Sequence, residues 1–139
     1  MSLSEEHREF LATHRLCVVA AMRADGPPSL TPVYYVMDGD DLLISTTHSR
    51  AKTKLLKRDP RVSVCVLGEE MPFPYVTVFG RTSFTDEGAA ELMAQIGEAM
   101  MGSPVPEEAL PGLRDRAEAE GRVVMRVRAE RAIGLARRG

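Results

Sequence analysis

The chain has 139 residues, which suits one domain spanning residues 1–139. Hydrophobic residues make up 44% and charged residues 27%, a composition typical of a globular protein and not of a disordered chain. Eighteen Lys and Arg against twenty Asp and Glu give a net charge of −2, so we expect no nucleic-acid partner. Two cysteines, short apolar runs and no signal-peptide pattern predict a cytoplasmic protein that is not bound to a membrane.

Strand patterns separated by short turns dominate the chain. The segment 61–67 (RVSVCVL) alternates with the period of a strand, and Asp38-Gly39-Asp40 is typical of a tight hairpin turn. In chain order we expect a helix at 4–12, strands at 16–22, 29–37 and 41–45, a helix at 50–58, strands at 61–67 and 75–84, helices at 86–101 and 107–118, and a strand at 122–128. Six strands joined mainly by tight turns predict a mainly β fold, an antiparallel barrel with peripheral helices. A doubly wound α/β fold is disfavoured, because no crossover helices separate the early strands.

Three details of the strands carry expectations about their positions. Pro32 predicts that its strand lies at an edge, at a bulge or against a ligand, and Gly80 predicts a bend or bulge. The run 16–22 (LCVVAAM) is apolar at every position, so neither face of that strand is suited to water. A small barrel can bury one of these faces. The other needs a partner, which a second copy in a symmetric homodimer would supply.

The segment 45–52 (STTHSRAK) has the clearest chemical pattern in the chain. A strand ends in the hydroxyl residues Ser45, Thr46 and Thr47, and a helix is expected to start near residue 49. The free backbone amides of a helix start, together with nearby hydroxyls, form a natural site for an anion.

The charges at this helix start oppose helix stability. Arg50 and Lys52 lie where the helix dipole disfavours cations, by about 0.3–1 kcal/mol each. Two unfavourable cations at a helix start, beside three hydroxyl residues, indicate an external anion such as a phosphate. The negative charge of the phosphate would make these cations favourable. The alternative is a solvated basic helix face without a ligand.

The run 26–67 (GPPSLTPVYYVMDGDDLLISTTHSRAKTKLLKRDPRVSVCVL) resembles the core signature of the pyridoxamine 5'-phosphate oxidase-like split β-barrel proteins. The shared order is Pro-x-x-x-Pro-Val-aromatic, Asp-Gly-Asp, a strand ending in Ser/Thr, a helical Lys, and Asp-Pro-Arg-Val. Residues 75–81 (YVTVFGR) and 122–128 (RVVMRVR) extend the match. The short length, the STT and DPRVSV segments and the C-terminal RVVMRVRAER resemble the branch that uses the deazaflavin coenzyme F-420.

The resemblance implies a homodimer of split β-barrels with two cofactor sites at the subunit interface. The cofactor is expected to be coenzyme F-420, with FMN as the alternative. If the family's binding positions are matched residue by residue, the cofactor phosphate would be held by Ser45, Thr46, Arg50 and Lys52, with Thr47 lining the same loop. The ring would lie along Thr31, Pro32, Val33 and Tyr34, and residues 71–78 would come from the facing subunit.

One departure from the family pattern leaves the choice of cofactor open. Ala51 stands where the oxidase has an Arg beside the helical Lys, and Arg50 lies one position earlier. The oxidase's C-terminal residues for the substrate phosphate have no counterpart, so a vitamin B6 substrate is not expected.

Three functions are compatible with this pattern. The first is an oxidoreductase that transfers a hydride between F-420 and an unsaturated small-molecule acceptor, the second an FMN-dependent oxidoreductase, and the third a non-catalytic flavin- or haem-binding module. No catalytic residue is assigned, because the cofactor brings its own chemistry. Tyr34 or a water molecule could supply a proton.

The remaining candidate residues have simpler interpretations. The histidines lack metal-ligand spacing, so no metal site is expected, and His48 either touches the phosphate or lies on a surface loop. Cys17 and Cys65 are expected to be buried, inert thiols. The helical spacing of Met93, Ile96, Gly97 and Met100 favours core or dimer packing over a ligand site.

Overall fold

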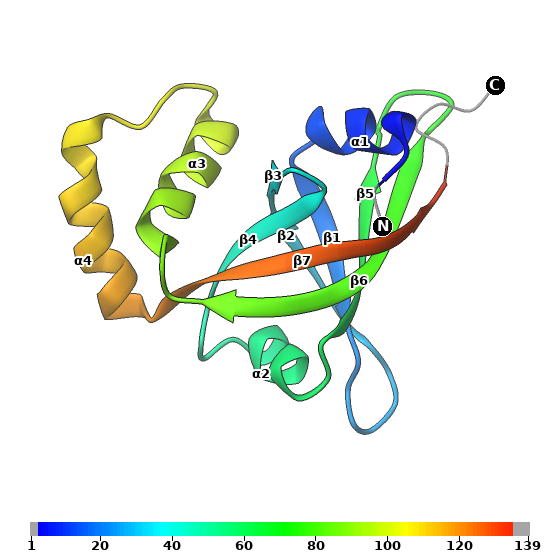
Figure 1. Ribbon diagram of the computed structural model, residues 1–139, viewed down its shortest axis with the longest axis horizontal. Helices are drawn as coiled ribbons and strands as arrows, with labels where there is room; N and C mark the ends of the chain where they lie inside the picture. Colours follow the sequence, from blue (N-terminus) through cyan, green and yellow to red (C-terminus); the bar gives the residue numbers. More distant parts are fainter. Residues whose placement is uncertain (1–2, 135–139) are drawn as a thin grey trace.

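Alternating burial along the strands builds one antiparallel sheet that curls into a barrel (Figure 1). The computed structural model describes residues 3–134. Its elements are α1 (Glu5–Ala12), β1 (Leu16–Ala21), β2 (Ser29–Tyr34), β3 (Val36–Asp38), β4 (Asp41–Thr47), α2 (Ala51–Arg58), β5 (Arg61–Leu67), β6 (Tyr75–Thr85), α3 (Ala89–Met101), the 3-10 turn η1 (Glu107–Ala109), α4 (Leu110–Glu120) and β7 (Arg122–Ile133). The strand order is β2-β1-β5-β6-β7-β4-β3, and every neighbouring pair is antiparallel.

The predicted fold class, mainly antiparallel β with peripheral helices, is confirmed, but the sheet has seven strands and not six. The predicted strand 29–37 is broken at Tyr35. The Tyr35 side chain is fully buried, its hydroxyl donates to the carbonyl of Leu11 at 2.6 Å, and its amide donates to the carbonyl of Arg15 at 2.9 Å. The chain therefore leaves the sheet after β2 and joins it again as β3, so that β2 and β3 lie at opposite edges.

The helices cover different parts of the barrel (Figure 1). α2 lies across one end, where it packs against β1 and β6, and α1 lies near the other end. The α3–α4 hairpin stands outside the barrel, beside β4 and the start of β7. β2 and β4 come into contact where the curled sheet closes. Within the described residues, no helix has the length and apolar character needed to cross a membrane.

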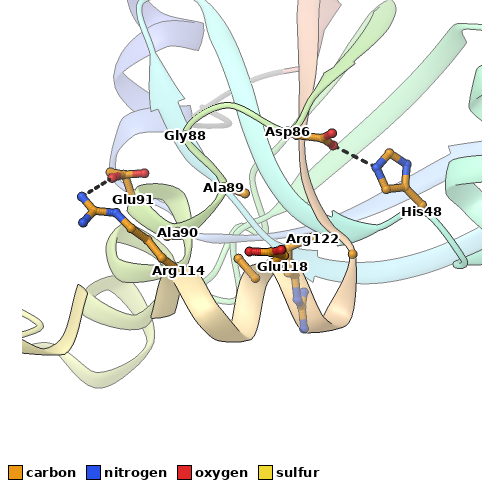
Figure 2. A pocket seen from close by; sticks show the side chains of 11 residues that line it. His48, Asp86, Gly88, Ala89, Ala90, Glu91, Arg114, Glu118 and Arg122 are labelled. Carbon is orange, nitrogen blue, oxygen red and sulfur yellow. Dashed lines mark hydrogen bonds and ion pairs between the residues drawn. The ribbon is translucent and has the colours of Figure 1, made fainter. Parts of the chain in front are cut away.

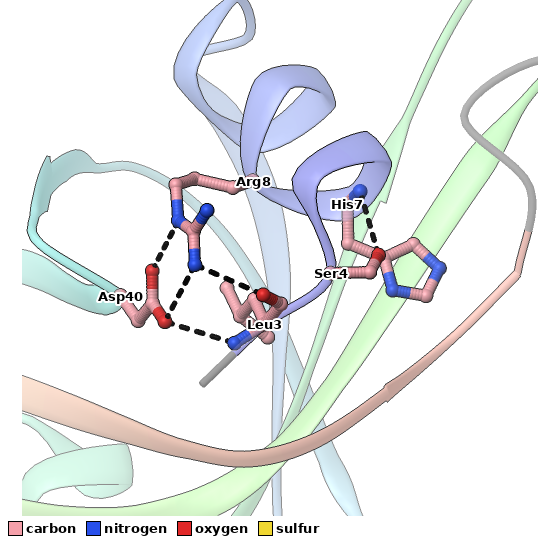
Figure 3. Close-up of polar contacts among 5 residues, drawn as sticks. All are labelled: Leu3, Ser4, His7, Arg8 and Asp40. Atoms are coloured by element: carbon pink, nitrogen blue, oxygen red, sulfur yellow. Dashed lines mark hydrogen bonds and ion pairs between the residues drawn. The ribbon is translucent and has the colours of Figure 1, made fainter. Parts of the chain in front are cut away.

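The start of α1 is tied to the turn between β3 and β4 (Figure 3). Ser4 caps α1 as its sequence pattern predicts, accepting from the amide of His7 at 3.1 Å. Arg8 Nε donates to Asp40 Oδ1 at 2.7 Å, and the amide of Leu3 donates to Asp40 Oδ2 at 2.8 Å. Arg8 also donates to the carbonyl of Leu3 at 2.9 Å, so one carboxylate and one guanidinium hold the N-terminal segment on the barrel.

The strand predictions at Pro32 and Gly80 are confirmed. β2, which carries Pro32, is an edge strand. The register between β6 and β7 shifts at Phe79/Gly80, and a Cβ on Gly80 would collide with the carbonyl oxygen of Arg128. Only glycine therefore allows the two strands to approach at this bulge.

Several predicted boundaries were wrong. α3 begins at Ala89 after Gly88 with φ 83°, because the Asp86 side chain does not cap it and instead contacts His48. The helix predicted at 107–118 is a 3-10 turn followed by α4, which runs on to Glu120. β4 extends to Thr47 and β7 to Ile133, because each pairs with neighbours far away in the sequence.

Candidate functional site

The start of α2 buries a lysine against the barrel. α2 begins at Ala51, with Arg50 as the N-cap residue, and no side chain caps its amides. Its buried face contains Lys52, Thr53 and Leu56. Lys52 is only 8% exposed, and Thr53 lies fully buried beside it with its hydroxyl 3.2 Å from that of Thr46. The predicted basic position is thus not a solvated helix face.

The charges around Lys52 do not neutralise it. Burial lowers the pKa of the Lys52 ammonium, and the positive charges of Arg50 and Arg122 lower that pKa further. Cys17 acts in the opposite direction, but burial raises the pKa of its thiol to about 12, so this thiol is neutral at pH 7. Across residues 3–134, no ion pair includes Lys52 or Arg50. The helix start therefore holds positive charge that an external anion would balance.

A second unsatisfied group lies on β2. Thr31 pairs with Val19 of β1, whose side chain is fully buried, so Thr31 faces the interior of the barrel. Its hydroxyl oxygen is buried and has no hydrogen-bond partner among the described residues. A buried polar group without a partner costs roughly 1–3 kcal/mol, so such groups mark places where a ligand or water completes the structure.

The structure divides the predicted phosphate residues between two faces of β4. Successive side chains of a strand point to opposite faces. Thr46 points inward to Thr53, whereas Ser45 and Thr47 point outward. Arg122 of β7 donates to the Ser45 hydroxyl at 3.5 Å, and the Thr47 hydroxyl lies 3.2 Å from that of Ser49. Ser45 and Thr47 thus share the outer face with Arg122, while the Thr46 hydroxyl belongs to the inner contact with α2.

The predicted ring-binding strand is divided in the same way. Thr31 and Val33 face the interior, and Pro32 and Tyr34 alternate with them toward the outer face. An open cavity of about 470 Å³ adjoins this strand, with Val33, Tyr34 and Ser45 on one side and α3 and α4 on the other. This cavity brings together candidate residues from β2 and β4.

Met93, Ile96, Gly97 and Met100 also line this cavity. Their helical spacing favours core or dimer packing over a ligand site. A helical apolar stripe has the same pattern whether it meets a core or a cavity, so the sequence does not distinguish the two.

His48 is not available to a phosphate in this structure. Its Nε2 lies 2.9 Å from Asp86 Oδ1, and its Nδ1 lies 2.7 Å from Lys57 Nζ, so both ring nitrogens are engaged. These contacts tie the loop before α2 to the end of β6. They border a second cavity of about 390 Å³, at whose opposite side Arg114 donates to Glu91 at 3.2 Å (Figure 2).

The burial predicted for both cysteines is confirmed at Cys17 only. Cys17 is buried as predicted, whereas Cys65 is only partly buried, and both are free thiols. In the segment 71–78, Met71 is 77% and Phe73 57% exposed, so both are free to contact another molecule.

Sequence reasoning did not single out Arg122 as a candidate site residue. It contacts Ser45, lines both cavities and adds to the positive charge around Lys52. The two contacting residues are 77 positions apart in the chain, and only the pairing of β4 with β7 brings them together. No local sequence pattern indicates the contact between Ser45 and Arg122.

Comparisons with known proteins agree with this fold. A family model described as pyridoxamine 5'-phosphate oxidase matches residues 3–136. A conserved hypothetical protein from Mycobacterium tuberculosis has a similar structure, with a TM-score of 0.81 and 25% identity, covering 97% of this chain and 86% of that chain. An F-420 reductase is similar with a TM-score of 0.75 and 21% identity, covering 94% of this chain and 98% of that one. A haem storage protein from Vibrio cholerae is similar with a TM-score of 0.67 and 20% identity, covering 96% and 94%.

Proposed function

The chain belongs to the pyridoxamine 5'-phosphate oxidase family, and on that premise we propose that it is an oxidoreductase that binds coenzyme F-420. The observation that carries this proposal is the buried, unneutralised Lys52 at the start of α2. A phosphate is the anion that such a site accommodates best, since helix-start amides, hydroxyls and cations all donate to its oxygens.

The residues present fit such a cofactor. Lys52 and Arg50 would balance the phosphate charge, and Ser45 and Thr47 would donate hydroxyl hydrogen bonds to it. Thr46 would support the loop through its contact with Thr53, which is 3.2 Å away. The ring would lie along residues 31–34, where Pro32 and Tyr34 face outward and Val33 and Tyr34 line the 470 Å³ cavity.

The chemistry would come mainly from the cofactor. When bound, reduced F-420 supplies a hydride to an electron-poor double bond of an acceptor, which also takes up one proton and is thereby reduced by two electrons. The chain's own residues would bind the phosphate, orient one ring face and exclude water from it. Tyr34, which lines the 470 Å³ cavity, or a water molecule would deliver the proton.

FMN is the second candidate cofactor. A FAD-binding protein from Mesorhizobium loti has a similar structure, with a TM-score of 0.65 and 22% identity. The phosphate site proposed above would serve FMN equally well. A non-catalytic flavin- or haem-binding role is the third candidate, since the haem storage protein shares this fold.

We also propose that the protein is a homodimer. The outer face of β1 and β2 carries Leu16 and Leu30, which are 50% and 63% exposed, and Met22 directly after β1 is 47% exposed. Pro32 and Tyr34 share this face. A second copy on this surface would cover the apolar residues and border the candidate cofactor site.

Titration with oxidised F-420, reduced F-420 and FMN, followed by absorbance and fluorescence, tests the cofactor proposal. We expect saturable binding of F-420 that is tighter than that of FMN, because the sequence resembles the branch of the family that uses F-420. Lys52→Gln should weaken this binding roughly ten- to 150-fold, as for loss of a charge-assisted hydrogen bond. Lys54→Gln is the matched control, because Lys54 is exposed on the same helix.

Three results bear on the alternatives. If neither cofactor binds, the oxidoreductase proposal is wrong. Tighter binding of FMN would replace F-420 with the second candidate. A bound cofactor that no electron acceptor can reoxidise would favour the non-catalytic module.

A further inference from the structure

The cavity between the α3–α4 hairpin and the barrel has a largely apolar wall on the side of the hairpin. This wall consists of Met93, Ile96, Met100, Val105 and Leu113. The cavity measures about 470 Å³, which lies in the range of small-molecule sites. Methionine side chains are flexible and polarisable, so this wall can adapt to an apolar molecule of variable shape.

The polar side of the same cavity has an excess of positive charge. Arg116 of α4 and Arg122 of β7 both line the cavity. Both also contact the same carboxylate, Glu120, at 3.3 Å and 2.9 Å. Two guanidinium groups thus share one carboxylate, which leaves one positive charge to be balanced at this end of the cavity. An anionic group on a ligand would balance it.

The cavity also adjoins the candidate cofactor surface. Tyr34 and Val33 of the predicted ring-binding strand form part of its lining, together with Ser45. A molecule in this cavity would therefore lie beside the place proposed for the ring. The cavity therefore combines an apolar wall, an arginine pair with one unbalanced charge and a position beside the proposed ring.

We propose that this cavity binds the acceptor as an apolar organic molecule with a single anionic group, such as a carboxylate. This inference rests on the proposed function for the role of acceptor, but binding at the cavity can be measured without any cofactor. The apolar part of the ligand packs on α3 and α4. The anionic group pairs with Arg116 and Arg122.

Two fluorescent probes of similar shape separate the two parts of this proposal. The first is 1-anilinonaphthalene-8-sulfonate, which is apolar with one anionic group, and the second is its uncharged relative N-phenyl-1-naphthylamine. We expect both to bind saturably to the cofactor-free protein. Arg116→Gln should weaken binding of the anionic probe about three- to tenfold and leave binding of the uncharged probe unchanged.

Arg114→Gln is the matched control. Arg114 and Arg116 both lie on α4, both pair with a glutamate, and their side chains are 60% and 59% exposed. Arg114 lines the other cavity and not this one, so its substitution should change neither probe. Met100→Glu places a negative charge in the apolar wall and should weaken the binding of both probes. Met100 is 51% exposed, so the fold should tolerate the change.

The outcomes separate this proposal from the cofactor proposal. Absence of saturable probe binding, or equal effects of Arg114→Gln and Arg116→Gln, would overturn the proposed acceptor site. Arg116→Gln should bind F-420 or FMN as the parent does, because Arg116 has no part in the proposed cofactor site. A parent protein that binds the probes but neither cofactor would refute the oxidoreductase while retaining the cavity as an anion-binding site.

Discussion

Lys52 and Thr31 are placed in ways that work against stability. Lys52 is a buried cation near two further cations, and Thr31 is a buried hydroxyl without a partner among the described residues. Natural sequences break local rules of this kind mainly at functional sites, where a ligand compensates. Both lie on elements that the family resemblance assigns to the cofactor, β2 and the start of α2.

The cost of burying Lys52 predicts how the cofactor-free protein responds to pH. The pKa of Lys52 is lowered in the folded state relative to about 10.4 in the unfolded chain. Below the folded value both states carry the charge, and the folded state bears its full cost. As pH rises from there to about 10.4, the unfolded chain holds the proton more strongly, so stability increases.

Lys52→Met should therefore raise the unfolding temperature of the cofactor-free protein at pH 7 by about 2–4 °C. This gain should shrink as the pH approaches 10, and thermal unfolding at a series of pH values measures it. Lys54→Met, on the exposed side of α2, should have little effect. A Lys52→Met protein that is clearly less stable than the parent at pH 7 would show that the lysine is structural.

At the scale of elements, one carboxylate, Asp40, ties the start of α1 to the turn between β3 and β4. The Arg8 guanidinium beside Asp40 lowers the pKa of this carboxyl, and the amide of Leu3 lowers it further. A carboxyl with a lowered folded pKa contributes stability above its unfolded value of about 3.9. That contribution is lost as pH falls through the folded value.

Asp40→Asn should lower the unfolding temperature at pH 7 by about 2–5 °C, because the Arg8 contact loses its charge. Thermal unfolding of both proteins should converge only as the pH falls through the lowered folded pKa of Asp40, where the parent carboxylate becomes protonated as well. Asp25→Asn is the control, since Asp25 forms a similar two-bond contact with Arg23 but is 65% exposed in its side chain. Equal losses in both variants would refute a special role for the α1 contact.

Elements defined by local pattern could be predicted from the sequence, and contacts between distant elements could not. The Ser4 cap follows from the residue itself, and Pro32 and Gly80 limit their positions to a few possibilities, of which the structure has the sheet edge and the bulge. The break at Tyr35 depends on a bond to Leu11, which lies 24 positions away and on another element. No periodicity within the segment 29–37 encodes that bond.

The candidate site shows the same limit. The cations and hydroxyls of residues 45–52 are visible in the sequence, and their unusual charge order predicts an anion. Strand alternation then separates Thr46 from Ser45 and Thr47, although the three are consecutive. Arg116, Arg122 and the α3–α4 cavity depend on how the hairpin packs against β4 and β7, which the local sequence does not specify.

At the scale of the whole molecule, the outer face of strands β2, β1 and β5 exposes apolar residues that a single barrel does not cover. Leu30 lies opposite Ala20 in the β1–β2 register, and the Pro32 and Tyr34 positions continue the same face. Leu67 of β5 is 57% exposed. Exposed apolar residues on adjacent strands are typical of an interface between subunits. Since Tyr34 also lines the cavity proposed for the acceptor, loss of the proposed dimer should affect that site as well.

Light scattering during gel filtration should therefore give about twice the mass of one chain for the parent. Leu30→Glu should yield a folded monomer with weakened F-420 binding, because Leu30 is 63% exposed in the single chain and a charge there opposes association. Met101→Glu is the control, because Met101 is 79% exposed and belongs to α3 and not to the β2–β1–β5 sheet, and this variant should remain dimeric with unchanged binding. A monomeric parent, or a Leu30→Glu protein that stays dimeric, would place the partner elsewhere and separate the cofactor site from this surface.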